Sequence, residues 1–370
     1  MLEIADIVRT VGPAYREAHG SRLLPSHRRA LDDLATCRTA ALGGHLRQCD
    51  HCDQTQYRYH SCRNRHCPKC HGEQTRRWLD RHAARLLPCP YFLVTFTLPQ
   101  ELRAIARCHQ RLVYDALLRA AAETLVTIAA DPAHLGARPA ILAVLHTWTQ
   151  DLRYHPHVHV LITGGGLTPD GSRWIPTPRP NFLFPGFVLS RVFRGKMRNA
   201  LRRTHVADQA PPRTWTRDWV VHVQPAGSGQ RVLEYLGRYV FRIAITNRRL
   251  ESFTNGHVTF RCRNRRTGQQ ASRTLPASTF LARFLQHVLP RGFTKVRHYG
   301  LASPTCRRHL DAARAALSPA PTPVAQSSSP DEAGAVAATE PVVIPEADRC
   351  PGCHVGRLVV VAILPRARPP

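Results

Sequence analysis

The residues best suited to chemistry are the histidines of YHPHVHV, residues 154–160. In an extended strand, side chains two residues apart project from the same face, so His157 and His159 would point the same way. Two such imidazoles can bind one divalent ion and leave coordination positions open for a substrate oxygen. The pattern predicts a catalytic metal site, with Mg²⁺ or Mn²⁺ as the ion.

A second reactive pair is found in EYLGRYVFR, where Tyr235 and Tyr239 stand four residues apart. This spacing places both side chains on one face of a helix. A tyrosine hydroxyl can attack a DNA phosphate and form a covalent phosphotyrosine, which preserves the bond energy for later rejoining. Two tyrosines allow two successive strand transfers, and Arg238 and Arg242 are candidates to steady the phosphate.

The metal needs a third ligand, and the sequence offers several. Asp151 has the same parity as the two histidines if the segment between them stays extended. A carboxylate also suits a hard cation better than imidazoles alone. We therefore predict Asp151, with Gln150 and Glu234 as weaker alternatives; the plain interpretation of His146 is a core histidine.

The cysteines are clustered near the N-terminus. Cys49, Cys52, Cys67 and Cys70 form a C-x2-C-x14-C-x2-C pattern, whose two short loops can bring four thiolates to one tetrahedral zinc. Two further cysteines in this segment could supply a second zinc, alternative ligands or nothing: Cys37 and Cys62.

Basic residues accompany these cysteines. Arg63 and Arg65, together with Lys69, could set the zinc-binding segment against phosphates. The segment is therefore predicted to bind DNA.

A lone half-site stands near the C-terminus, at Cys350-x2-Cys353. A closed structural zinc site needs four ligands, so this pair must be completed by other residues or shared between chains if it binds metal at all. The other cysteines are interpreted as packing or surface thiols: Cys89, Cys108, Cys262 and Cys306.

The composition favours a nucleic-acid partner. The formal net charge is +27, and 49 of the 52 basic residues are arginine, whose guanidinium binds phosphate bidentately. No apolar stretch approaches the length of a membrane helix; LVVVAIL at 358–364 is much too short. Without a secretory signal, we expect a cytoplasmic protein with reduced thiols.

Hydrophobic periodicity predicts an α+β fold, an antiparallel sheet with helices on its faces. Strands are expected at 91–98, 140–148, 156–163, 218–224 and 257–263, the second and third paired as a hairpin. Helices are expected at 100–129 (one long or two shorter), 187–204, 230–243 and 277–289.

This pattern divides the chain into four parts. We expect an N-terminal helical and zinc-binding region at 1–88, a catalytic domain at 89–311, a linker at 312–348 and a tail with the half-site at 349–370. The linker is assigned from its Ala, Pro and Ser content.

Taken together, these motifs resemble the IS91-family transposases, the two-tyrosine type with a His-hydrophobe-His strand. The resemblance covers roughly residues 30–310. It rests on YHSCRNRHCPKCHG (59–72), LHTWTQDLRYHPHVHVLITGGGL (145–167), EYLGRYVFRIAITNRRL (234–250) and VRHYGL (296–301).

The resemblance implies a zinc-binding region followed by a catalytic domain related to rolling-circle replication initiators. It implies metal-assisted nicking of single-stranded DNA at element ends, with a 5′-phosphotyrosine linkage and a free 3′-OH. Metal ligation maps onto His157 and His159, and the nucleophiles map onto Tyr235 and Tyr239. Unwinding would depend on host replication or helicase machinery, and a bacterial protein would associate with the nucleoid when bound to DNA.

Two other functions remain open at this point. A non-catalytic zinc-dependent regulator would bind DNA without covalent attachment. A metal-dependent nuclease that uses water would cleave without the tyrosines. The charge cannot separate the three, because all would bind DNA with a steep salt dependence.

Overall fold

The computed structural model describes every residue except 71, 241–243, 264–266, 319–347 and 368–370. The chain divides into two compact units: unit 1 comprises residues 1–35 and 64–318, and unit 2 comprises residues 36–63 and 319–370. Each unit contains its own antiparallel sheet. Among the described helices, none combines the length and apolar character needed to cross a bilayer.

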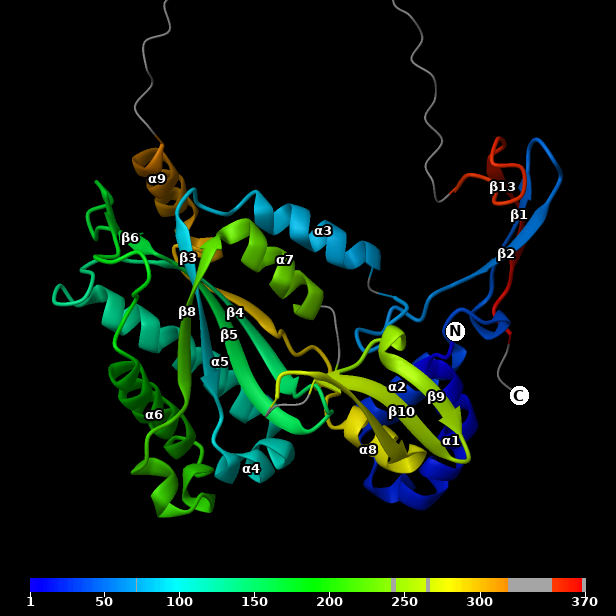
Figure 1. Cartoon of the computed structure of the whole chain (residues 1–370), viewed down its shortest axis with the longest axis horizontal. Helices are drawn as coiled ribbons and strands as arrows, with labels where there is room; N and C mark the ends of the chain where they lie inside the picture. Colours follow the sequence, from blue (N-terminus) through cyan, green and yellow to red (C-terminus); the bar gives the residue numbers. More distant parts are fainter. Residues whose placement is uncertain (71, 241–243, 264–266, 319–347, 368–370) are drawn as a thin grey trace, which may run out of the picture. The chain divides into compact units, whose positions relative to one another are not determined.

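Unit 1 is built around a five-stranded antiparallel sheet in the order β12-β4-β5-β3-β8 (Figure 1). The predicted hairpin pairs β4 with β5, and β5 is the central strand. The strands are β3 (Pro90–Thr97), β4 (Ala140–Trp148), β5 (Tyr154–Thr163), β8 (Val221–Ser228) and β12 (Val296–Gly300).

One face of this sheet carries the main hydrophobic core. Alternate residues such as Phe92, Val158 and Ile162 are fully buried there. They pack with helices α4 (Arg103–Cys108), α5 (Gln110–Ala130) and α6 (Gly186–Arg202). Burial of each large apolar side chain contributes about 1.5–3 kcal/mol, so this face provides most of the stability of the sheet.

The opposite face is covered by two helices, α3 (Gly72–Ala83) and α7 (Gly229–Val240), which pack against each other (Figure 1). Trp78 of α3 and Leu233 of α7 are buried with Leu93, Val144 and Leu161 of the sheet. The sequence alternation thus determines which residues α7 covers, because every second strand residue faces it.

Glycine at position 237 allows α7 to lie close to α3. A Cβ atom added there would stand 2.9 Å from Leu79 Cγ and closer still to one of its methyl groups. We expect Gly237→Ala to lower the free energy of unfolding by about 1 kcal/mol, because overpacking outweighs the better helix propensity of alanine.

Gly195 offers a matched control for this change. It lies on the exposed side of α6, and an added Cβ atom would meet nothing within 4 Å. Gly195→Ala should therefore raise the thermal midpoint, while Gly237→Ala should lower it. Equal shifts in the same direction would contradict close packing of α3 on α7.

A second, smaller sheet in unit 1 has the order β11-β10-β9. Asn255 and Gly256, both with positive φ, form the tight turn between β9 and β10. Phe260 of β10 packs against Phe280 of α8, and α8 contacts α1. The elements are α1 (Ile4–His19), α2 (Pro25–Thr36), β9 (Leu250–Thr254), β10 (His257–Arg263), β11 (Gln270–Pro276) and α8 (Ala277–Leu285).

Shorter elements complete unit 1. Leu167, Leu301 and Leu310 form a satellite core between the short hairpin and the last helix. These elements are β6 (Gly165–Leu167), β7 (Trp174–Pro176) and α9 (Arg307–Leu317). Single 3₁₀ turns of unit 1 occur at Gly20–Arg22, Gln100–Leu102, Ala207–Gln209, Pro212–Trp215, Asn247–Arg249 and Pro304–Cys306, and unit 2 has one at Ala40–Leu42.

Unit 2 contains a three-stranded antiparallel sheet in the order β13-β1-β2. Its strands are β1 (Gly44–Cys49), β2 (Thr55–Tyr59) and β13 (Leu358–Leu364). The buried guanidinium of Arg47 donates to the carbonyl oxygen of Leu358 (2.8 Å) and pairs with Asp348 (2.5 Å). The hydrophobic cluster of this sheet consists of Leu358 and three cysteines, which is too small to stabilise the unit.

The α+β class with antiparallel sheets is confirmed, and several elements match their expected ranges closely. β4 and β10 have the predicted bounds, and the long helix region consists of two helices, α4 and α5. The strand expected at 218–224 begins three residues later, at Val221. The apolar segment 358–364 is strand β13, which the sequence did not predict.

Candidate active site

Three histidines meet on the sheet face that α3 and α7 cover. His157 and His159 lie on β5, and His146 lies opposite His157 on β4. His159 is two residues from Leu161, and His146 is two residues from Val144, so both continue the buried row that packs against α7. The alternation of side chains that places Val144 and Leu161 against α7 therefore also places the histidines on the sheet face covered by α7.

The imidazoles are close enough to share one ion. One ring nitrogen from each of His146, His157 and His159 lies within 4.8 Å of the others. The ring centroids are 5.3 Å apart for His146 and His157, 4.6 Å for His146 and His159, and 4.9 Å for His157 and His159. Three neutral imidazoles in this arrangement form a donor set suitable for a divalent transition metal.

Hydrogen bonds orient two of these rings. His157 Nδ1 donates to the carbonyl oxygen of His155 at 2.7 Å, and His159 Nδ1 is 3.1 Å from Thr95 Oγ1 on β3. A metal-binding histidine commonly has its second ring nitrogen held in this way, which fixes the tautomer and the ring plane. Nε2 of His157 is therefore the nitrogen available to a metal.

The surroundings keep His146 and His159 uncharged. Burial lowers the pKa of His159 to about 3, with a further contribution from the charge of His157. Burial also holds the pKa of His146 well below its usual range, and the charges of His159, His157 and Lys295 lower it further. Neutral imidazole is the form that binds metals, so these rings need lose no proton to act as ligands near pH 7.

Asp151 does not join this cluster. The chain turns at residues 149–153, where Leu152 has a φ of 61°, so the parity argument for an extended segment fails. The carboxylate instead accepts from Thr149 and pairs with Arg153 (2.5 Å) and Arg273 (3.1 Å). Burial raises the pKa of Asp151, but these hydrogen bonds outweigh it, and the pKa lies below its ordinary value. Asp151 fastens the hairpin turn to β11.

His146 is the residue that sequence reasoning overlooked. The hairpin between 140–148 and 156–163 was predicted, and its register places residue 146 beside residue 157. The signal was therefore present, because a histidine stands on the neighbouring strand with the required parity. Of the two weaker alternatives, Glu234 is not in the cluster of described metal-binding groups, and Gln150 lies in the turn between β4 and β5.

The tyrosine segment forms a helix as predicted. Tyr235, Arg238 and Tyr239 lie on α7, which ends at Val240; their side chains are outside the description, as is Arg242 altogether. Leu233, two residues before Tyr235, is buried against the sheet face that carries the histidines. α7 begins beside Tyr91, which pairs with Thr163, at the end of β5 remote from His157.

The two arginines predicted to contact DNA differ in their surroundings. Arg63 is exposed, as expected for a phosphate contact. Arg65 is half-buried and donates to the carbonyl oxygen of Phe293 at 2.6 Å, so it braces the interior of unit 1. Lys69 pairs with Glu3. Of these three residues, Arg63 is the one the structure presents to solvent.

The cysteines group differently from the sequence expectation. Cys49 and Cys52 are placed with the C-terminal pair, Cys350 and Cys353, within unit 2. The predicted set of Cys49, Cys52, Cys67 and Cys70 is thus not brought together, because Cys49 and Cys52 have their partners at the other end of the chain.

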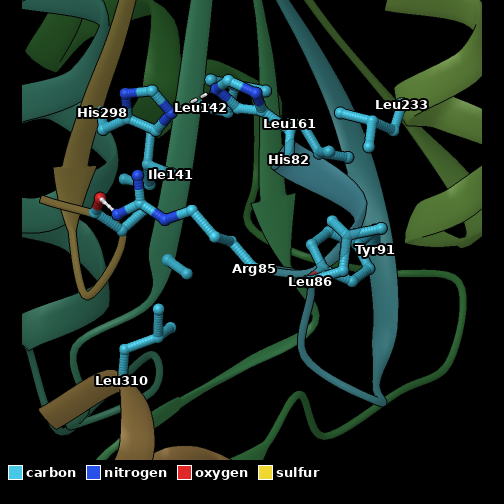
Figure 2. A pocket seen from close by; sticks show the side chains of 12 residues that line it. His82, Arg85, Leu86, Tyr91, Ile141, Leu142, Leu161, Leu233, His298 and Leu310 are labelled. Carbon is cyan, nitrogen blue, oxygen red and sulfur yellow. Dashed lines mark hydrogen bonds between the residues drawn. The ribbon is translucent and has the colours of Figure 1, made fainter. Parts of the chain in front are cut away.

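A small cavity lies beside α3 on the same side of the sheet, with a volume of about 40 Å³ (Figure 2). At its edge His82 Nε2 is 3.1 Å from His298 Nε2, and burial lowers the pKa of His298 to about 4. This volume holds little more than one water molecule. The cavity is therefore no binding site for a nucleotide base.

Comparison with known proteins identifies related transposases. A family model described as "Putative transposase" matches residues 140–309, and the IS91 model described as "Transposase zinc-binding domain" matches residues 7–98. The first model includes the histidine cluster and the tyrosine helix, and the second includes six of the eight clustered cysteines.

Two curated relatives are similar over most of the chain. A putative transposase, y4qJ, of Sinorhizobium fredii (strain NBRC 101917 / NGR234) is 41% identical, covering 98% of this chain and 95% of the relative. The transposase for insertion sequence element IS801 of Pseudomonas savastanoi pv. phaseolicola is 30% identical, covering 78% of this chain and 74% of the relative. No solved structure matches. The protein belongs to the IS91 family of transposases.

Proposed function

We propose that this protein is a transposase that nicks and rejoins single-stranded DNA at the ends of an insertion sequence, through 5′-phosphotyrosine intermediates, in rolling-circle-like transposition. The observation that carries the proposal is the cluster of His146, His157 and His159 on the face packed by α7, the helix of Tyr235 and Tyr239. Phosphodiester cleavage requires a metal site and a nucleophile; the histidines would supply the first, and the helix that carries the tyrosines packs on the same sheet face.

The histidine cluster fits a divalent ion. His146, His157 and His159 would hold it, and their neutral rings offer nitrogen ligands without a carboxylate. Such a donor set favours Mn²⁺ over Mg²⁺, because imidazole is a softer ligand than oxygen. A bound ion supplies positive charge to a phosphate oxygen as negative charge develops in the transition state.

The protein's own part in the reaction is the tyrosine attack. Oη of Tyr235 or Tyr239 forms a bond to phosphorus, and the bond from phosphorus to the 3′ oxygen breaks. The tyrosine proton is released, and the leaving oxygen is protonated to a free 3′-OH. The second tyrosine repeats this attack at the next junction, and the 3′-OH groups reverse the linkages when strands are rejoined.

The architecture supports a division of labour. The antiparallel sheet with its histidine strand would form a nuclease domain related to rolling-circle initiators, over roughly residues 89–311. The zinc-binding region would bind DNA through exposed residues such as Arg63. Strand opening would fall to the host's replication or helicase machinery.

The rival function with the best claim is a metal-dependent nuclease that uses water. It shares the metal site but not the covalent intermediate. The tyrosine helix on the same sheet face favours the transposase, because a water-using enzyme has no need of it. A regulator without catalysis would explain neither the histidines nor the helix.

The test uses single-stranded oligonucleotides that cover both flanks of the gene. Each is labelled on the 3′ side of the expected nick, the side whose 5′ phosphate would become attached to the protein. Full-length protein is incubated with them and Mn²⁺, Mg²⁺ or a chelator, and the products are separated on a denaturing gel. We expect label attached to protein, more with Mn²⁺ than with Mg²⁺ and none with chelator. Cleavage without an attached label would support the water-using nuclease and refute the proposal.

A further inference from the structure

A cysteine cluster lies entirely within unit 2. It joins Cys49, the last residue of β1, and Cys52 to Cys350 and Cys353, which precede β13. We infer that these four thiolates bind a second structural zinc ion, in a ribbon assembled from the N-terminal segment and the C-terminal tail. This inference does not depend on the nicking mechanism.

The sulfur geometry matches a tetrahedral tetrathiolate site. A Zn–S bond of about 2.3 Å in a regular tetrahedron separates neighbouring sulfurs by about 3.8 Å. The Sγ atoms of Cys49 and Cys353 are 3.7 Å apart, as are those of Cys52 and Cys350, and all four lie within 4.8 Å of one another. A disulfide would require about 2 Å.

Two loops of the same construction hold the thiols. The N–H of His51 donates to Cys49 Sγ and the N–H of Gly352 donates to Cys350 Sγ, both at 3.4 Å. In each loop the residue after the second cysteine has a positive φ, 57° at Asp53 and 56° at His354. Donors aimed at sulfur stabilise thiolate, which is the form that binds zinc. The same backbone conformation in both loops indicates that they are preorganised to bind a metal ion.

Glycine permits the two loops to approach each other. A Cβ atom on Gly356 would stand 2.5 Å from Cys49 Sγ and 2.6 Å from His51 Cβ. The N–H of Gly356 is 3.3 Å from Cys353 Sγ, so this glycine both contacts the first loop and supports the second. Any larger residue would force the thiol pairs apart.

The described residues of unit 2 bury little apolar surface in the cluster around the thiols. Its hydrophobic cluster consists of Leu358 and three of the four cysteines themselves. A zinc ion at the centre of that cluster would replace the missing core, as in small domains that fold only with metal. Strand β13 then completes the sheet by pairing with β1, from Gly44–Leu364 to Cys49–Leu358.

Thiol alkylation of the full-length, zinc-loaded protein tests the inference. Each cysteine's reactivity is measured by mass spectrometry with and without a zinc chelator. We expect Cys350 and Cys353 to be protected together with Cys49 and Cys52, and to react at least about tenfold faster once zinc is removed. If chelation leaves the reactivity of Cys350 and Cys353 unchanged, the inference is wrong.

The variant Cys49→Ser tests the grouping itself. It should expose Cys350 and Cys353, about 300 residues away, while Cys67 and Cys70 stay protected. Exposure of Cys67 and Cys70 instead would support the spacing-based set and overturn the inference. Cys108→Ser, at an exposed cysteine outside both clusters, should alter neither pattern.

Zinc content gives an independent readout on the same proteins. Cys350→Ser should release one zinc per chain and expose Cys49 and Cys52. Unchanged zinc in Cys350→Ser would overturn the inference. The chelation experiment on the unaltered protein decides the matter even if a serine variant fails to fold.

Discussion

Replacing His146 by alanine is expected to reduce metal-dependent cleavage by at least about 100-fold, because it removes one of three nitrogens from the candidate metal site. Substrate binding should change little, since phosphate contacts on basic surfaces provide most of the affinity. The measurement is the single-turnover rate of oligonucleotide cleavage at saturating protein, with Mn²⁺ titrated. A raised requirement for Mn²⁺ would identify the lost ligand.

Asp151→Asn is the matched comparison for His146→Ala. Asp151 pairs with Arg153 and Arg273 away from the histidines, so its loss should cost about 1 kcal/mol of stability and leave the cleavage rate within about threefold. The reverse ranking, with Asp151→Asn inactive and His146→Ala active, would restore the carboxylate as the third ligand.

Tyr235→Phe and Tyr239→Phe together are expected to abolish the covalent adduct, a fall of at least about 1000-fold, because these two hydroxyl groups are the proposed source of the attacking oxygen. Each single variant should block one of the two strand transfers and stop complete transposition. Adduct formation on oligonucleotides measures the attack by tyrosine, and transposition frequency in cells measures the complete reaction.

Tyr299→Phe provides the control for the tyrosine variants. Tyr299 lies on β12 with the core on the opposite face of the sheet, so removal of its hydroxyl should leave adduct formation unchanged. Binding of single-stranded DNA should be retained in all of these variants. Full transposition by the double variant would exclude these tyrosines as nucleophiles.

The central hairpin could be predicted because its information is local. Alternating apolar residues defined β4 and β5, and the short connection between them specified antiparallel pairing. The same alternation correctly placed His157 and His159 on one face. β12 was missed because its five half-buried residues give no clear alternation, and it pairs with a strand about 150 residues earlier.

The third member of the histidine cluster shows where such reasoning stops. Residues two apart share a face only while the strand remains extended. The turn at Leu152 separates Asp151 from the histidines of β5, so the carboxylate does not share their face. Cross-strand register, not parity along one strand, brings His146 to His157. A sequence argument that followed the predicted hairpin across to its partner strand would have included His146.

The cysteine grouping failed for a different reason. The interval between Cys52 and Cys67 is typical of zinc sites, so the spacing favoured a local solution. The structure places Cys49 and Cys52 with Cys350 and Cys353, at the other end of the chain. Contacts between residues about 300 positions apart leave no periodic trace in one sequence.

The pairing of β1 with β13 has a consequence for protein synthesis. β1 leaves the ribosome long before residues 358–364 are translated, so during most of synthesis it has an unpaired edge, and Cys49 and Cys52 lack their partner thiols. A chain interrupted before Cys350 can never complete this unit. If the unit is needed to hold DNA, only fully translated molecules can engage it, and truncated products that still carry the histidines and tyrosines would be kept from nicking the genome.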